Sequence, residues 1–328
     1  MQAPDTGPRR FSSVRLLFTG FAMGIADLIP GVSGGTMAFI LGIYETLLAA
    51  IKSFNLRLLQ LIGQGRLREA FNQIPWAFLI PLGLGLGVAV LSMARVMRYL
   101  LENQPVYLFA FFFGLIVASI IAVGMTVQWR PSTVAALVLG SLGAYLLVGM
   151  VPLAMPHDPI TLFLSGAVAI MAMILPGISG SFILLILGQY AYVLNAVSEL
   201  NLLAVIPVAL GAVIGLLGFA RLLSWLLKHY HSVTVAVLIG FMVGSLRKIW
   251  PWKEVVETML DRHGKVVPLR ERNILPDFAA PEFWVALALA ILGFLVLSLV
   301  DHLQTGANPV FSRFGRVRQR DTGPVASQ

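Results

Sequence analysis

The chain has 328 residues, of which 58% are hydrophobic and only 12% are charged, and its mean hydropathy is +0.87. Because soluble domains carry about 25% charged residues, this composition excludes an ordinary soluble protein and predicts a polytopic membrane protein. The net charge of +8 lies mostly in loops and at the ends, where it suits anionic lipid headgroups and forms no soluble basic face for a nucleic acid.

Residues 1–10 are polar and contain two prolines, and we expect them to be a disordered basic N-terminus. An apolar helix is predicted from Phe11 to Ile29, and a second helix from Ser33 to Ile51. A Pro-Gly-Val turn separates them, and it must break the helix because proline lacks an amide and glycine has low helix propensity. We therefore predict a re-entrant hairpin, 11–51, within the membrane.

The tip of this hairpin has the features of an anion site. Ser33 is a typical N-cap residue, and Gly34 and Gly35 leave the first amides of the next helix uncovered. A helix N-terminus carries partial positive charge and binds anions. Asp27 has two alternative roles here: a cap for loose amides, or a proton carrier or substrate gate, because a carboxylate at membrane depth is costly.

The following elements are predicted from hydropathy. A polar linker, 52–73, precedes three transmembrane helices, and a second hairpin then precedes three more. The transmembrane helices are predicted at 75–101, 105–125, 133–151, 202–228, 233–246 and 283–300. The second hairpin covers 160–198, a mixed-charge insertion covers 250–282, and a basic tail covers 302–328. Within the insertion, we expect a short helix from Trp252 to Arg262, ended by Gly264.

The second hairpin repeats the first. Its turn reads LPGISGS, with the same Pro-Gly-x-Ser-Gly pattern at one constant offset. Two differences break the repeat: Gly35-Thr36 becomes Ser181-Phe182, and Met173 stands where Asp27 stands. A second constant offset relates later residues, among them Arg95 to Arg221.

An odd number of spans in each half predicts that the two halves enter the membrane in opposite orientations. The fold class is therefore all-α, with two inverted repeats, 11–151 and 160–301, each a broken-helix hairpin plus three transmembrane helices. Lys and Arg in the short loops fall on the side of both termini, which predicts cytoplasmic termini and an external insertion.

Other candidate residues are few. Arg95 and Arg221 either bind phosphate as bidentate guanidinium groups or extend to the lipid headgroups. The chain has no cysteine, and its five histidines show no ligand spacing, so we expect no metal and no cofactor. No nucleotide-binding motif and no Ser-His-Asp order is present.

Two motifs carry a family resemblance: GFAMGIADLIPGVSGGTMAFILGIYE, from Gly20 to Glu45, and LPGISGSFILLILGQY, from Leu175 to Tyr190. With them the chain resembles, over about Arg15 to Asp301, the PopT family of bacterial polyprenyl-phosphate (undecaprenyl phosphate) translocases. The resemblance implies that undecaprenyl phosphate is returned from the outer to the inner leaflet for envelope glycan synthesis. The family's motif positions carry over as Asp27, Pro30, Gly31, Ser33, Gly34, Gly35, Thr36, Pro176, Gly177, Ser179, Gly180 and Ser181.

Three alternatives stay open. A carrier of a small soluble anion should have an aqueous cavity closed to lipid. A membrane enzyme acting on lipid phosphate would have only Asp27, Ser33 and Ser179 as candidates, and a scaffold would leave the doubled motif unexplained. Proton coupling and homo-oligomerisation also stay open.

Overall fold

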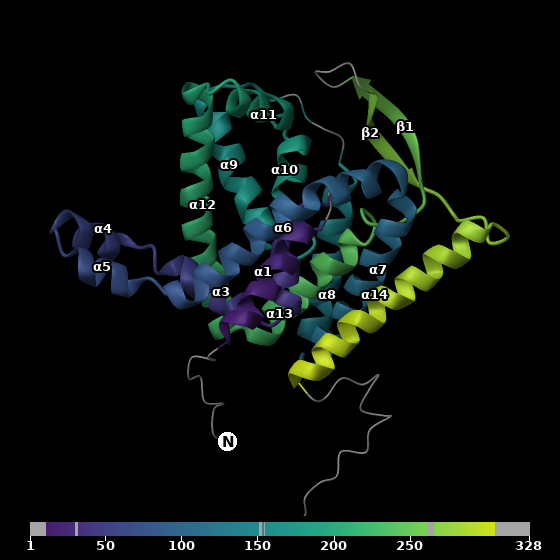
Figure 1. The fold of residues 1–328 in the computed structure, drawn as a ribbon, viewed down its shortest axis with the longest axis horizontal. Coiled ribbons are helices and arrows are strands. Elements are labelled where there is room, and N and C mark those ends of the chain that lie inside the picture. The colour runs from purple at the N-terminus through teal and green to yellow at the C-terminus, as the bar shows by residue number, and fades with distance from the viewer. Residues whose placement is uncertain (1–10, 30–31, 151–152, 154, 261–265, 306–328) are drawn as a thin grey trace, which may run out of the picture.

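The computed structural model describes residues 11–29, 32–150, 153, 155–260 and 266–305, and these residues are mostly helical (Figure 1). The first half contains α1 (Ser13–Asp27), α2 (Gly34–Ile40), α3 (Tyr44–Lys52), α4 (Leu56–Gly63), α5 (Leu67–Gln73), α6 (Trp76–Asn103), α7 (Pro105–Gly124) and α8 (Pro131–Val148). The second half contains α9 (Pro159–Ile174), α10 (Gly180–Ile186), α11 (Tyr190–Ser198), α12 (Leu202–His229), α13 (His231–Ser245), β1 (Lys253–Leu260), β2 (Val266–Asn273) and α14 (Pro281–Thr305).

Long apolar helices confirm the prediction of a multi-pass membrane protein. Among the described residues, five helices are long and apolar enough to cross a membrane: α6, α7, α8, α12 and α14. The predicted span at 233–246 corresponds to α13, which has 15 residues. At 1.5 Å per residue it covers about 22 Å, less than the hydrocarbon thickness of about 30 Å.

Each hairpin contains three helices rather than the two that were predicted. The helix expected from Ser33 to Ile51 bends by 120° between α2 and α3, and the helix expected over 179–198 bends by 113° between α10 and α11. Gly42 and Gly188 cause these bends, with φ of 71° and 68°. Glycine adopts this left-handed region readily, whereas side-chain-bearing residues do so at a cost.

The linker between the first hairpin and α6 is also more ordered than expected. It forms α4 and α5, which project from the rest of the molecule at the left of Figure 1. Leu58 and Leu61 of α4 pack against Ala70 of α5 and form a small core of their own. Leu56 and Leu59 are exposed, so α4 is apolar on more than one face.

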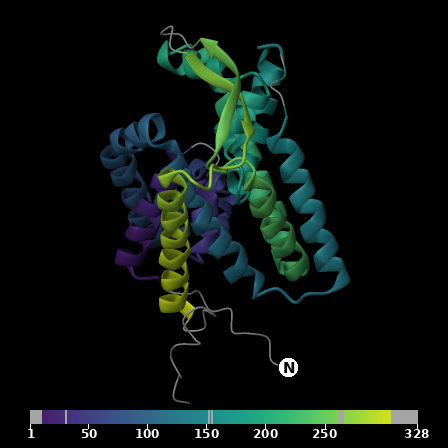
Figure 2. The same ribbon diagram turned by 90° about the vertical axis from the view of Figure 1, so that its right-hand side faces the viewer.

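The insertion contradicts one prediction. The helix expected from Trp252 to Arg262 is wrong, because β1 and β2 form an antiparallel pair there (Figure 2). Val255, Val256 and Thr258 are β-branched, and such side chains favour strands. Gly264, the expected helix end, lies outside the described residues.

Helix pairs within each half meet through glycines at equivalent positions. Gly20 of α1 lies against the backbone of Leu82 in α6, and Gly166 of α9 lies against the backbone of Val208 in α12. Small residues let two backbones approach closely in a membrane. Gly83, in contrast, has open space around it, so only some glycines of α6 are packing residues.

The third long helix of each half packs on the other half. Gly140 of α8 lies against the backbone of Val237 in α13, and Gly293 of α14 lies against the backbone of Phe111 in α7. Each half therefore contributes its last helix to the packing of the opposite half. The packing of α8 on α13 and of α14 on α7 joins the two halves.

Candidate functional site

The two hairpin tips are in direct contact. The backbone N–H of Gly177 donates a hydrogen bond to Thr36 Oγ1 at 2.8 Å. The Tyr44 hydroxyl donates to the carbonyl of Ile174 at 2.9 Å. A Cβ atom at Gly35 would come within 2.8 Å of the Ile174 carbonyl oxygen, so a glycine is required at this contact.

The first tip already holds an anion of its own. Asp27 Oδ1 accepts a hydrogen bond from the Gly34 N–H at 2.6 Å, and Ser33 Oγ accepts from the Thr36 N–H at 3.2 Å. The prediction that Gly34 presents an uncovered amide is therefore wrong, because the carboxylate occupies it. The structure supports the capping role of Asp27, and its role in proton transfer stays a prediction.

The second tip lacks this carboxylate. Ser179 Oγ accepts from the Phe182 N–H at 3.3 Å and lies 3.4 Å from Ser181 Oγ. The N–H groups of Gly180 and Ser181 have no hydrogen-bond partner among the residues that the structure describes. A serine thus caps both helix starts, but only the first has a carboxylate on its first amide.

A cavity of about 180 Å³ lies between the two halves, beside the first tip. Its polar lining residues are Asp27 and Tyr44, beside Gly34 and Gly35. Its remaining walls are apolar: Met23, Leu47, Leu48, Ile51, Leu86, Ile170, Met173, Ile174 and Leu216. This lining suits a molecule that has one polar group and an apolar remainder.

Several predicted site residues lie away from this cavity. Ser33 is fully buried and caps its own helix. Pro176 and Gly177 are buried at the contact between the tips. The cavity lining does not include Ser179, Gly180 or Ser181. Pro30 and Gly31 lie outside the described residues.

The two arginines are exposed and do not line the cavity. The guanidinium of Arg221 donates to the carbonyls of Leu217 at 2.9 Å and Phe54 at 3.4 Å, so it lies beside the end of α3. Arg95 is nine residues beyond Leu86 on α6, which places it about 13 Å along the helix from the cavity. Neither arginine contacts a hairpin tip in this arrangement.

One site residue, Tyr44, was missed by sequence reasoning. It is buried, forms part of the cavity lining and connects the first hairpin to α9. The available signal was the Gly-x-Tyr sequence, which recurs at Gly188 and Tyr190. Tyr190 is exposed, so the repeated residue has different surroundings in each half.

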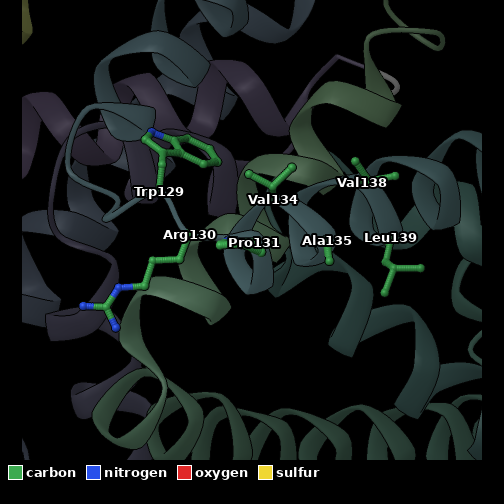
Figure 3. Close-up of a pocket in the computed structure, with 7 residues that line it drawn as sticks. All are labelled: Trp129, Arg130, Pro131, Val134, Ala135, Val138 and Leu139. Atoms are coloured by element: carbon green, nitrogen blue, oxygen red, sulfur yellow. The ribbon is translucent and has the colours of Figure 1, made fainter.

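A larger hollow of about 760 Å³ lies elsewhere, at the start of α8 (Figure 3). Figure 3 shows Val134, Val138 and Leu139 along its wall, while the guanidinium of Arg130 points away from them. None of the predicted site residues lines this hollow. Its apolar surface is open, as expected of a helix face in contact with lipid.

Residues 23–267 match the protein family described as undecaprenyl phosphate translocase-like. Among similar proteins, the polyprenyl-phosphate transporter of Vibrio cholerae is 42% identical over 286 residues, which cover 85% of this chain and 93% of that protein. The polyprenyl-phosphate transporter of Staphylococcus aureus is 32% identical over 262 residues, which cover 74% of this chain and 88% of that protein. No solved structure matches this chain.

Proposed function

The chain belongs to the undecaprenyl phosphate translocase-like family, and from this premise we propose that it is a lipid-phosphate flippase. Its substrate is undecaprenyl phosphate, which it returns from the outer to the inner leaflet of the bacterial cytoplasmic membrane. The names of two relatives as polyprenyl-phosphate transporters support the class of substrate. Transport proceeds without ATP.

The proposed architecture is two inverted repeats, 11–151 and 160–301. Matching helix lengths support it: α2 and α10 have seven residues each, α3 and α11 have nine, and α6 and α12 have 28. In Figure 1, α11 and the strands lie at the top, whereas α3 and the last turns of α14 lie lower. We propose that the lower end is cytoplasmic, with both termini, and that the strands are external.

The central cavity carries the proposal. Asp27 is the single charged residue of its lining, and its carboxylate accepts a hydrogen bond from the Gly34 N–H. A phosphate oxygen could accept the same hydrogen bond. We propose that the phosphate replaces the carboxylate at Gly34 while the prenyl chain stays in the lipid. Asp27 is then the gate of the site, and uptake of a proton by its carboxylate would release the amide.

The proposed substrate-binding residues are those of the two tips together with the paired arginines. Arg95 and Arg221 guide the headgroup at the two faces of the membrane. The complete set is Asp27, Pro30, Gly31, Ser33, Gly34, Gly35, Thr36, Arg95, Pro176, Gly177, Ser179, Gly180, Ser181 and Arg221.

Proteoliposomes test the proposal directly. Purified protein should accelerate the movement of undecaprenyl phosphate between leaflets, and it should not release inorganic phosphate. Cells without the protein, in a strain lacking a redundant transporter, should accumulate undecaprenyl phosphate on the outer leaflet. Uptake of a soluble phosphate without lipid movement would instead identify a soluble-anion carrier, and phosphate release would identify an enzyme.

A further inference from the structure

Two lysines and one glutamate form a cluster where the insertion meets the helices. Lys248 follows α13, Lys253 begins β1, and Glu271 lies on β2. The Lys248 Nζ lies 3.4 Å and the Lys253 Nζ lies 3.3 Å from Glu271 Oε2. Two ammonium groups therefore share one carboxylate, so these three side chains together carry one excess positive charge.

The cluster is partly withdrawn from water. The side chain of Lys253 is only 10% exposed, and those of Lys248 and Glu271 are 25% and 27% exposed. Burial lowers the pKa of Lys253 to about 8, although the Glu271 carboxylate opposes this shift. Burial alone would raise the pKa of Glu271, but the two lysines outweigh burial and hold it below its usual value.

The cluster also adjoins the second hairpin. The Lys248 ammonium lies 5.2 Å from the ring centre of Phe182, which is the third residue of α10. The Lys253 ammonium lies 4.5 Å from the ring centre of Phe109 in α7. Thus one lysine faces the second tip and the other faces a helix of the first half.

We propose that Lys248 and Lys253 form a binding site for the phosphate monoester of a prenyl lipid. A phosphate monoester can accept charge-assisted hydrogen bonds from both ammonium groups. The aromatic rings beside them offer apolar surface to the first part of a prenyl chain. This site rests on the proposed function, and the proposed orientation puts it at the outer end, where the lipid would be captured.

Glu271 has a defined part in this proposal. It is the resident anion of the site, as Asp27 is at the first tip, and a phosphate must displace it. If the cluster only fastened the insertion to the helices, loss of the glutamate would weaken the fold and would not favour any ligand. The effect of removing Glu271 therefore separates a binding site from a structural ion pair.

The experiment measures the dissociation constant of farnesyl monophosphate for full-length protein in nanodiscs of zwitterionic lipid. K248Q and K253Q should each weaken binding about tenfold, because each removes a charge-assisted bond. E271Q should tighten binding several-fold, and K248R should bind like the unchanged protein. The proposal would be overturned if K248Q and K253Q both bound farnesyl monophosphate as tightly as the unchanged protein. It would also be overturned if E271Q bound this ligand more weakly.

R272Q is the matched control. Arg272 forms another ion pair between the same two strands, at 2.7 Å from Glu254, and both side chains are exposed. Its loss should leave farnesyl monophosphate binding unchanged. Thermal unfolding of each variant checks that the insertion stays folded, and only variants that unfold like the unchanged protein are compared.

Two further probes distinguish this site from the proposed transport. Inorganic phosphate should bind at least tenfold more weakly than farnesyl monophosphate, and equal affinity would overturn the lipid assignment. Protein that binds farnesyl monophosphate through these lysines but moves no undecaprenyl phosphate would retain the site and refute the transport function. Transport that proceeds equally well in K248Q and K253Q, with unchanged binding, would refute the site alone.

Discussion

The two hairpins share a sequence pattern and a helix order, yet the charged groups beside them have opposite signs. The first has the carboxylate of Asp27 on the amide of Gly34. The second has Met173 at the equivalent position, and the ammonium of Lys248 lies over its Phe182 ring. The repeat thus determines where the helices break, and the side chains around each break differ.

This difference makes the two ends of the proposed transport route unequal. Two identical anion sites would hold a phosphate equally well at either end. Under the proposed function, Lys248 beside the second hairpin would attract the phosphate, whereas Asp27 at the first tip would repel it until the carboxylate is neutralised or displaced. Substitutions at equivalent positions test whether the two halves share one architecture, and substitutions where the halves differ test the role of each charge.

The largest effect is expected where the halves are equivalent. Valine at Gly20 or at Gly166 would put its Cβ into the backbone of the facing helix, at Leu82 or Val208. Overpacking of this kind costs about 3 kcal/mol. Thermal unfolding in detergent should show similar losses of stability for G20V and G166V, since the two contacts occupy equivalent positions.

G83V is the control for this pair. Gly83 lies on α6 near Leu82, but an added Cβ there would meet nothing within 4 Å. We expect G83V to unfold close to the temperature of the unchanged protein. A strong loss in only one of G20V and G166V would contradict the equivalence of the two halves.

The next largest effect is expected at Asp27, which has no acidic counterpart in the second half. An asparagine keeps an oxygen that can accept from the Gly34 N–H, but it cannot carry a proton or a charge. We expect D27N to stay folded, with transport of undecaprenyl phosphate reduced at least about tenfold if its charge operates the gate. If D27N transported normally and only D27A lost stability, Asp27 would be a structural cap and not a gate.

The next prediction concerns the pH dependence of Lys253, which shares Glu271 with Lys248. Its pKa of about 8 means that the ammonium is present below this value and is lost as the pH rises through it. The charged groups that face it are Glu271 and Lys248. A phosphate monoester has its second pKa near 6, so the ligand stays dianionic across this range.

Binding of farnesyl monophosphate should therefore weaken between pH 7 and pH 9, by up to about tenfold as the charged fraction of Lys253 falls. K253R should remove most of this change, because arginine stays protonated. A pH profile that is the same in K253R and in the unchanged protein would assign the titration to another group.

The broken hairpins and the long spans could be predicted because proline, glycine and long apolar runs determine them locally. The bends at Gly42 and Gly188 were missed because each glycine lies inside an apolar run and acts only through its positive φ. The strands of the insertion were missed because Gly264 was interpreted as the end of a helix. The Asp27–Gly34 bond and the Lys248–Phe182 contact depend on three-dimensional packing, which spacing in the sequence does not reveal.

The smallest expected effect on stability concerns the contact between the tips. Valine at Thr36 keeps the shape of the side chain but removes the oxygen that accepts from the buried Gly177 N–H. An unsatisfied buried donor costs about 1–3 kcal/mol. T36V should lower the unfolding temperature, whereas T36S, which keeps the hydroxyl, should recover most of the loss. If the tips move apart during transport, T36V should reduce the transport rate by a smaller factor than its loss of unfolding free energy corresponds to. Equal stability of T36V and the unchanged protein would show that this hydrogen bond does not hold the two hairpins together.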